Sequence, residues 1–450
     1  MVRVTDMTHG RPIRLILLFS LPLMLGSVFQ QLYTIVDTII IGRGVGMQAL
    51  ASIGAADWIN WLVLWGLQGF TQGFAILAAQ EFGAGAYDRL RRVLAMIVKL
   101  SCWFGIAVTI ISLLLVRPLL TLLHTDPAVF GGAQTYLYVQ FGGSLIIIAY
   151  NMAAAVLRCL GDSRTPLFAI IAASFANIAL DLLFVMGFGW GIFGASFATV
   201  LAQLIAFLLC LRSLRRLPFV QLTKADWKTD PAILLHLCRL GIPTGLQMSM
   251  ITLGGMVLQS VLNGFGVVFV AGYTAANKLY GILESASVAF GYAMTAYMGQ
   301  NRGARNAARI DAGIRAVLVL SAEFTAAIVT AMFLAGKPLL GLFLSTEEAG
   351  AADALAVAYQ YLMVLMAFLF ALFMLQAYRS SLQGLGEMTV PTLSGFAEML
   401  MRMGAALVLP IFIGQSGVFF AEGAAWVCAA ALNLVWYYMQ IGKIKRDMLQ

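Results

Sequence analysis

Two aspartates stand inside apolar stretches of this sequence, where a charge is costly. Asp37 lies in the run from Ile13 to Ile41, and Asp181 lies in a later run that ends in the turn GFGWG. Each aspartate comes shortly before a glycine, Gly42 or Gly187, that marks the expected end of its helix. At the rise of an α-helix, both carboxylates lie roughly 8–9 Å below that end. An ionisable residue at such a depth is by default a functional candidate.

Further oxygen-bearing side chains are expected at a similar depth. Asn177 is four residues before Asp181 and therefore shares its helix face, and Thr199 lies about 12 Å from the start of the following helix. Carboxylate, amide and hydroxyl oxygens suit a small hard cation, and two close carboxylates readily share a proton. The pattern predicts a site for Na⁺ or H⁺ formed by Asp37, Asn177, Asp181 and Thr199. The alternative is that each aspartate only bonds to a neighbouring helix for stability.

A second group of polar residues is expected to line a cavity. Gln30, Tyr33 and Thr34 form a polar patch in the same apolar run as Asp37, and Tyr33 and Asp37 share one helix face because they are four residues apart. Asn151 is expected nearer the opposite membrane surface. We predict that Gln30, Tyr33, Thr34 and Asn151 contact a small organic substrate.

The chain that positions these residues has the composition of a polytopic membrane protein. Of its 450 residues, 61% are hydrophobic and only 11% are charged, whereas a soluble protein of this length needs a far more charged surface. A hydrocarbon core about 30 Å thick requires roughly 20 apolar residues per helix. Such segments begin near residues 13, 49, 93, 130, 166, 191, 232, 268, 312, 352, 391 and 417. The predicted fold is all-α, with twelve transmembrane helices.

The loop charges test this number of helices. With twelve segments, most of the 28 lysines and arginines fall on one side of the membrane; Arg43, Arg117 and Lys337 fall on the other, and Lys278 and Arg402 lie inside segments. This bias predicts a plasma-membrane protein with both termini in the cytoplasm. The net charge of +8 does not indicate nucleic acid as a partner, because the basic residues form short scattered clusters rather than one stripe.

The two halves of the sequence resemble each other. ASIGAADWI (51–59) aligns with AGYTAANKL (271–279), and the turn LGDSRTP (160–166) aligns with LGEMTVP (385–391). Each half contains an even number of helices, so both halves enter the membrane from the same side as parallel repeats. The predicted organisation is a six-helix lobe at 1–212, a cytoplasmic linker at 213–231 and a second six-helix lobe at 232–450.

The second repeat carries intramembrane charges of its own. Aligning the two turns places Arg402 opposite Asn177, so the cation site is not duplicated. Arg402 follows Glu398 by four residues, the spacing of an intrahelical salt bridge, whereas Lys278 and Glu284 are six residues apart and do not face each other directly. We expect Glu398 and Arg402 to neutralise each other and hold the lobe together. The alternative is a charge lever that repacks as the lobes move.

Four motifs in order resemble one known family. They are FQQLYTIVDTIIIGR, LRCLGDSRTP, NIALDLLFVMGFGWGIFGASFATVLAQ and the GQNRGA loop, and they are similar to segments of the multidrug and toxic compound extrusion transporters. The resemblance implies two six-helix lobes with a cavity between them. It implies export of amphipathic, often cationic compounds, driven by inward movement of Na⁺ or H⁺. It also implies a coupling site at Asp37, Asn177, Asp181 and Thr199, and a cavity position for Asn151.

One feature departs from a branch of that family, which carries a carboxylate after the proline of its seventh helix. Here Pro243 is followed by TGLQMSMITLGG, without an acid, so the coupling site of that branch is not carried over. An alternative function is a lipid-linked precursor flippase of a related superfamily. Such a protein would be expected to place basic residues in a central cavity, whereas only Lys278 and Arg402 lie inside segments.

An intramembrane enzyme would need a nucleophile with a base, or a metal site. The sequence contains no GxxxxGK[ST] or HExxH motif, and its three histidines lie near loops or helix ends. We therefore expect no enzymatic activity and no cofactor besides the coupling ion. The expected partners are small organic molecules and membrane lipid, and the expected state is a monomer.

Overall fold

The computed structural model describes residues 4–344 and 350–449, which form thirteen α-helices and no β-strand. Ten helical segments are long and apolar enough to cross a membrane, and a bent pair, α4 (Pro127–Gly142) with α5 (Ser144–Cys159), makes an eleventh. The remaining long helix, α9 (Val267–Gly303), is more polar because it contains Lys278, Glu284 and Arg302. With α9 these are the twelve segments that the sequence predicts, and the all-α membrane fold is confirmed.

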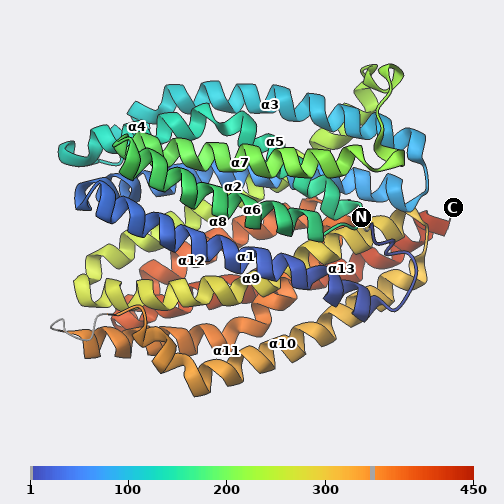
Figure 1. The fold of residues 1–450 in the computed structure, drawn as a ribbon. Helices are drawn as coiled ribbons and strands as arrows, with labels where there is room; N and C mark the ends of the chain where they lie inside the picture. Colours follow the sequence, from blue (N-terminus) through green and yellow to red (C-terminus); the bar gives the residue numbers. More distant parts are fainter. Residues whose placement is uncertain (1–3, 345–349, 450) are drawn as a thin grey trace. The chain divides into compact units, whose positions relative to one another are not determined.

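The order of the helices can be followed along the chain in Figure 1. The first half contains α1 (Pro12–Gly44), α2 (Met47–Gly83), α3 (Tyr87–Leu122), α4, α5, α6 (Arg164–Asp181), the π-helical turn η1 (Leu182–Gly187) and α7 (Gly191–Arg215). Two 3₁₀ turns follow, η2 (Pro218–Val220) and η3 (Lys224–Trp227). The second half contains α8 (Pro231–Leu262), η4 (Asn263–Phe265), α9, α10 (Ala307–Gly341), α11 (Ala351–Gly384), α12 (Thr389–Ile413), η5 (Gln415–Phe419) and α13 (Phe420–Leu449).

The contacts divide the chain into two compact units. The first unit contains Leu21–Gly245 and the residues up to Asp6, and the second contains Met7–Ser20 and the chain from Leu246 onward. Helices α1 and α8 therefore contribute to both units. These bounds differ from the predicted lobes, because the linker and the start of α8 belong to the first unit and the start of α1 belongs to the second.

Two sets of hydrogen bonds explain these assignments. In the second unit, Arg309 donates to the carbonyl oxygens of Met7 and Gly10 at 2.9 and 2.8 Å, and Asn301 donates to that of Met7 at 3.1 Å. In the first unit, Lys99 of α3 donates to the linker at the carbonyl oxygen of Trp227, 2.5 Å away. Asn301 of the GQNRGA segment and Arg309 of α10 thus anchor the chain just before α1, and Lys99 of α3 anchors the linker.

Gly143 lies at the bend between α4 and α5 and is packed against α7. The two helices meet at 50°, and a Cβ atom on residue 143 would lie only 2.5 Å from Cγ2 of Val200 on α7. Since carbon atoms do not approach so closely, a glycine is required at this contact. The bend lets α5 pack along α7, which in turn packs against α6, the helix that carries Asn177 and Asp181.

Candidate functional site

Asp37 of α1 and Asp181 of α6 lie side by side in the first unit. The two carboxyl groups are near enough to interact with each other. Oδ1 of Asp37 and both oxygens of Asp181 are buried without a hydrogen bond from any N–H or O–H of the described chain, and Asp181 is completely buried. Two ionised carboxylates have no donor to share, so a proton or another cation is needed to make this pair favourable.

The local structure around the pair fixes the position of Asp181. Helix α6 ends at this residue and continues directly as the π-helical turn η1, and such turns are frequent at functional sites. An apolar cluster packs just beyond the carboxylates and joins four elements. Its buried members are Ile40, Ile41, Ala49, Val185 and Ala195. This packing holds the ends of α1 and η1 together and keeps the carboxylates in an apolar setting.

Asn177 is placed as the sequence predicts, one helical turn before Asp181. Its side chain is only 1% exposed, and neither its amide nitrogen nor its carbonyl oxygen has a hydrogen-bond partner within residues 4–344 and 350–449. A buried amide without partners costs free energy, so the site gains from a ligand that satisfies it. Tyr33 also belongs here, since it interacts electrostatically with Asp37 and Asp181.

The other predicted residues are not joined to the carboxylates by hydrogen bonds. Thr199 donates to the carbonyl oxygen of Ala195 at 3.2 Å, and Asn151 donates to that of Ile147 at 2.9 Å, both within their own helices. Thr34 donates to the backbone of Gln30, and both of these side chains are exposed. The roles of Thr199, Asn151, Thr34 and Gln30 stay predictions.

The structure adds three residues that the sequence reasoning missed. Asp57 of α2 interacts with the charge of Asp37, and Tyr136 of α4 interacts with both aspartates. Asn60, one turn after Asp57, donates to the hydroxyl of Tyr136 at 3.3 Å. Asp57 is an acid inside an apolar segment. The same sequence feature pointed to Asp37, so Asp57 could have been found in the same way.

The charged residues predicted for the second unit separate into two kinds. Glu398 and Arg402 form the expected intrahelical salt bridge at 3.1 Å, with both side chains buried. Glu284 interacts with Tyr280 and with the charge of Glu422. Lys278 is exposed. Glu398 and Arg402 therefore belong to a buried ion-pair network, of which Lys278 is not a part.

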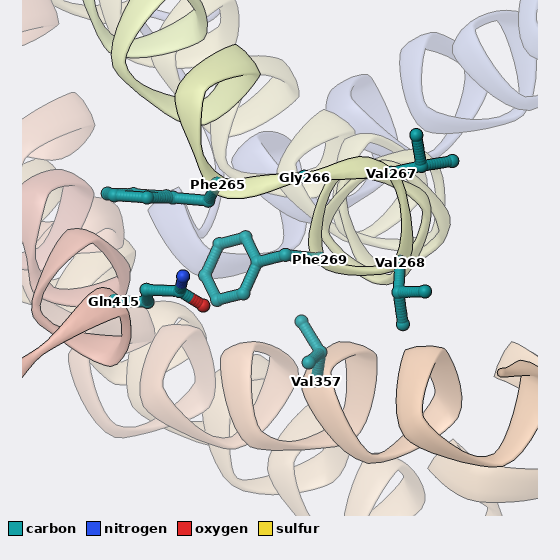
Figure 2. Close-up of a pocket in the computed structure, with 7 residues that line it drawn as sticks. All are labelled: Phe265, Gly266, Val267, Val268, Phe269, Val357 and Gln415. Carbon is teal, nitrogen blue, oxygen red and sulfur yellow. The ribbon is translucent and has the colours of Figure 1, made fainter.

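An apolar hollow of about 340 Å³ lies elsewhere in the second unit, where η4 leads into α9 (Figure 2). Its lining residues are Phe265, Gly266, Val267, Val268, Phe269, Val357 and Gln415. It contains none of the predicted site residues and no charged group. It therefore does not offer the chemistry expected of the functional site.

The oxygen ligands available around Asp37 and Asp181 limit which ions this site can bind. Within residues 4–344 and 350–449, no group of three or more His, Cys, Asp or Glu side chains is arranged to hold a metal ion. Two carboxyl groups and one amide supply oxygen ligands, which suit a proton or a weakly held hard monovalent cation rather than a transition metal.

Comparisons with known proteins agree on one family. The model of the MatE family matches residues 22–183 and 243–408. The chain is 31% identical over 447 residues to the probable multidrug resistance protein YpnP of Bacillus subtilis, covering 97% of each chain. It is 22% identical over 438 residues to the multidrug export protein MepA of Staphylococcus saprophyticus, covering 94% of this chain and 93% of MepA.

Solved structures show the same fold. A MATE protein crystallised in complex with MaL6 has a TM-score of 0.91 at 24% identity, covering 99% of this chain and 100% of that one. A MOP superfamily transporter from Pyrococcus furiosus also has a TM-score of 0.91 at 24% identity, covering 98% and 99%.

Proposed function

Because the chain belongs to the MatE family of multidrug efflux transporters, we propose that it exports amphipathic, often cationic, organic compounds in exchange for H⁺ or Na⁺. In this family the chain is a multi-pass membrane transporter and not an enzyme. The bias of the loop charges supports a plasma-membrane location with both termini in the cytoplasm. We further propose that it works as a monomer.

One observation carries the coupling proposal. Asp37 and Asp181 come from different helices, their carboxyl groups interact with each other, and their buried oxygens receive no hydrogen bond from the described part of the chain. A structural carboxylate in an apolar segment is expected to find a hydrogen-bond donor. The pair is better explained as the place where a proton or Na⁺ binds, with Asn177 as a further polar group and Thr199 as a predicted oxygen ligand.

The site also suggests how ion binding is coupled to movement. Asp37 lies on α1, most of which is not buried and which contains a proline, Pro22, in its interior. A cation between Asp37 and Asp181 draws α1 toward α6, and its release lets α1 move away. An ion that binds one position of α1 more tightly shifts the population toward that position, and the substrate must then affect ion affinity to the same extent.

The experiment is transport of a cationic dye in proteoliposomes, with Na⁺ and pH gradients imposed separately. We expect one of the gradients to drive dye transport in the wild type. Asp37→Asn and Asp181→Asn remove the exchangeable negative charge, so each should lower gradient-driven transport at least tenfold.

Glu323→Gln provides the matched control, because Glu323 is an exposed acid on α10. This variant should transport like the wild type. Undiminished transport by Asp37→Asn and Asp181→Asn would make the two aspartates structural and refute the coupling site. If no dye moves under either gradient, the flippase function becomes the better explanation.

A further inference from the structure

We propose that Asp57, Asn60 and Tyr136 form a second subsite in the first unit, which holds the positively charged nitrogen of an organic substrate. The inference rests on the proposed export function and names the residues that recognise the substrate's charge. It assigns the Asp37–Asp181 pair to the coupling ion and Asp57 to the cargo.

The geometry of the subsite comes from two helices. Asp57 and Asn60 are three residues apart on α2 and share a helix face. Asn60 donates its amide proton to the hydroxyl of Tyr136 on α4 at 3.3 Å. The carbonyl oxygen of Asn60 receives no hydrogen bond from the described residues, although the side chain is only 4% exposed. A buried acceptor beside a carboxylate favours the binding of a ligand group that carries an N–H or a positive charge.

The charge around Asp57 favours a cation. Among the described residues, Asp57 interacts electrostatically with Asp37 and Tyr136, and no lysine, arginine or histidine neutralises it. The one charged group that acts on Asp57 among the described residues is thus another acid. Bringing a positive group to Asp57 relieves this repulsion, and Tyr136 can add a hydroxyl oxygen to the ligand shell.

Aromatic rings next to Asp57 favour an organic cation over an inorganic ion. Trp58 and Trp61 form an edge-to-face pair with ring centroids 5.3 Å apart. Trp61 shares the face of Asp57, four residues on, and is 44% exposed. An indole face attracts an alkylated or aryl ammonium group. A small hydrated ion interacts with the ring less favourably, because it keeps its water shell.

The subsite is held in place by the packing behind it. Ala56 and Ile59 of α2 are buried in a cluster with Val116 and Leu120 of α3, against which Tyr136 also packs. Binding groups carried by helices with such support stay in position without the ligand. The carboxylate of Asp57 can therefore recognise charge without a rearrangement of α2.

The test compares binding with ion exchange. Ethidium binding to the full-length protein in detergent is followed by fluorescence anisotropy, and ethidium transport is followed in proteoliposomes. We expect Asp57→Asn to raise the Kd and the KM for ethidium at least tenfold, while the number of ions exchanged per ethidium, measured from reversal potentials, does not change. Asp57→Glu should restore most of the affinity, and Glu323→Gln should bind like the wild type.

The other outcomes are distinct. If Asp57→Asn changes the number of exchanged ions but not the Kd for ethidium, the positive group at Asp57 is the coupling ion, and the proposal is overturned. If neither quantity changes in a variant with the wild-type unfolding temperature, Asp57 is structural and the proposal also fails. If the wild type binds ethidium through Asp57 but moves none under any gradient, the export function fails while the subsite stands.

Discussion

Arg402 lies between two carboxylates, donating to Glu398 at 3.1 Å and to Glu422 at 2.8 Å. Arg379 binds the other oxygen of Glu398 at 2.5 Å, so four charges of alternating sign form one network in the second unit. Arg402 also donates to the carbonyl oxygen of Ile251 at 3.0 Å. The salt bridge that the spacing predicts is therefore part of a larger arrangement that joins α8, α11, α12 and α13.

Replacing Arg402 with methionine should destabilise the second unit strongly. The change leaves Glu422 without its partner and Glu398 with only Arg379, and breaking a buried pair in this way costs about 3–5 kcal/mol. The measurement is the unfolding temperature of the purified protein in detergent. Lys278→Met, which removes an exposed cation from α9, is the control and should have little effect. Equal losses in the two variants would contradict a stabilising network.

The close contact between Gly143 and Val200 predicts that the stability lost by a mutation at one position is partly restored by a mutation at the other. Gly143→Ala places a methyl group 2.5 Å from Cγ2 of Val200, and overpacking of this kind costs about 1–3 kcal/mol. Val200→Ala removes the opposing methyl groups, so the double variant should regain much of the stability lost by Gly143→Ala. Unfolding temperatures of the two single variants and the double variant measure this coupling. Strictly additive losses would show that the contact does not determine the bend.

We expect the stability of the folded linker to depend on pH, because Asp226 holds it through contacts of its carboxylate. Burial alone would raise the pKa of Asp226, but hydrogen bonds from the backbone and hydroxyl of Thr223 and the charges of Arg91 and Arg92 outweigh it and hold the pKa below its ordinary value. Because the pKa of Asp226 is lowered in the folded state, its contacts stabilise the folded linker at pH values above the ordinary pKa of aspartate. This stabilisation is lost as the pH falls through the pKa of Asp226 in the folded state. The protection factors of the linker amides, measured by hydrogen exchange, should therefore fall below about pH 4.

A variant tests the same contact at neutral pH. Asp226→Asn removes the charge that accepts the Thr223 hydrogen bonds, so trypsin should cut faster after Lys224 and Lys228. Glu323→Gln changes an exposed acid on α10, away from the linker contacts, and should leave the cleavage rate as in the wild type. Unchanged cleavage in Asp226→Asn would show that the linker is held by Lys99 alone.

Pro22 should matter for the rate of transport more than for binding. Proline removes a backbone hydrogen bond inside α1 and costs about 3 kcal/mol in a helix interior. Pro22→Ala should therefore stiffen α1, slow dye transport several-fold and leave the Kd for ethidium unchanged. Pro118→Ala, which alters the proline inside α3, should not slow transport. If both variants behave alike, bending of α1 is not part of the cycle.

Local patterns in the sequence determined the class of protein and several pairings. Length and hydropathy predict the membrane helices because each crosses the bilayer independently of its neighbours. The Glu398–Arg402 bridge and the shared face of Asn177 and Asp181 follow from helical spacing alone. The acid at Asp37 was singled out by its cost in an apolar segment.

Only the tertiary structure decided which helices face each other. It brought Asp37 to Asp181, added Asp57 with Tyr136, and extended the Glu398–Arg402 bridge to Arg379 and Glu422. It also assigned the chain before α1 to the second unit and the linker to the first. Spacing along one helix determines which residues share a face. The rotation of each helix about its axis, and the neighbour it packs against, depend on close contacts such as that of Gly143 with Val200, which join residues far apart in the sequence.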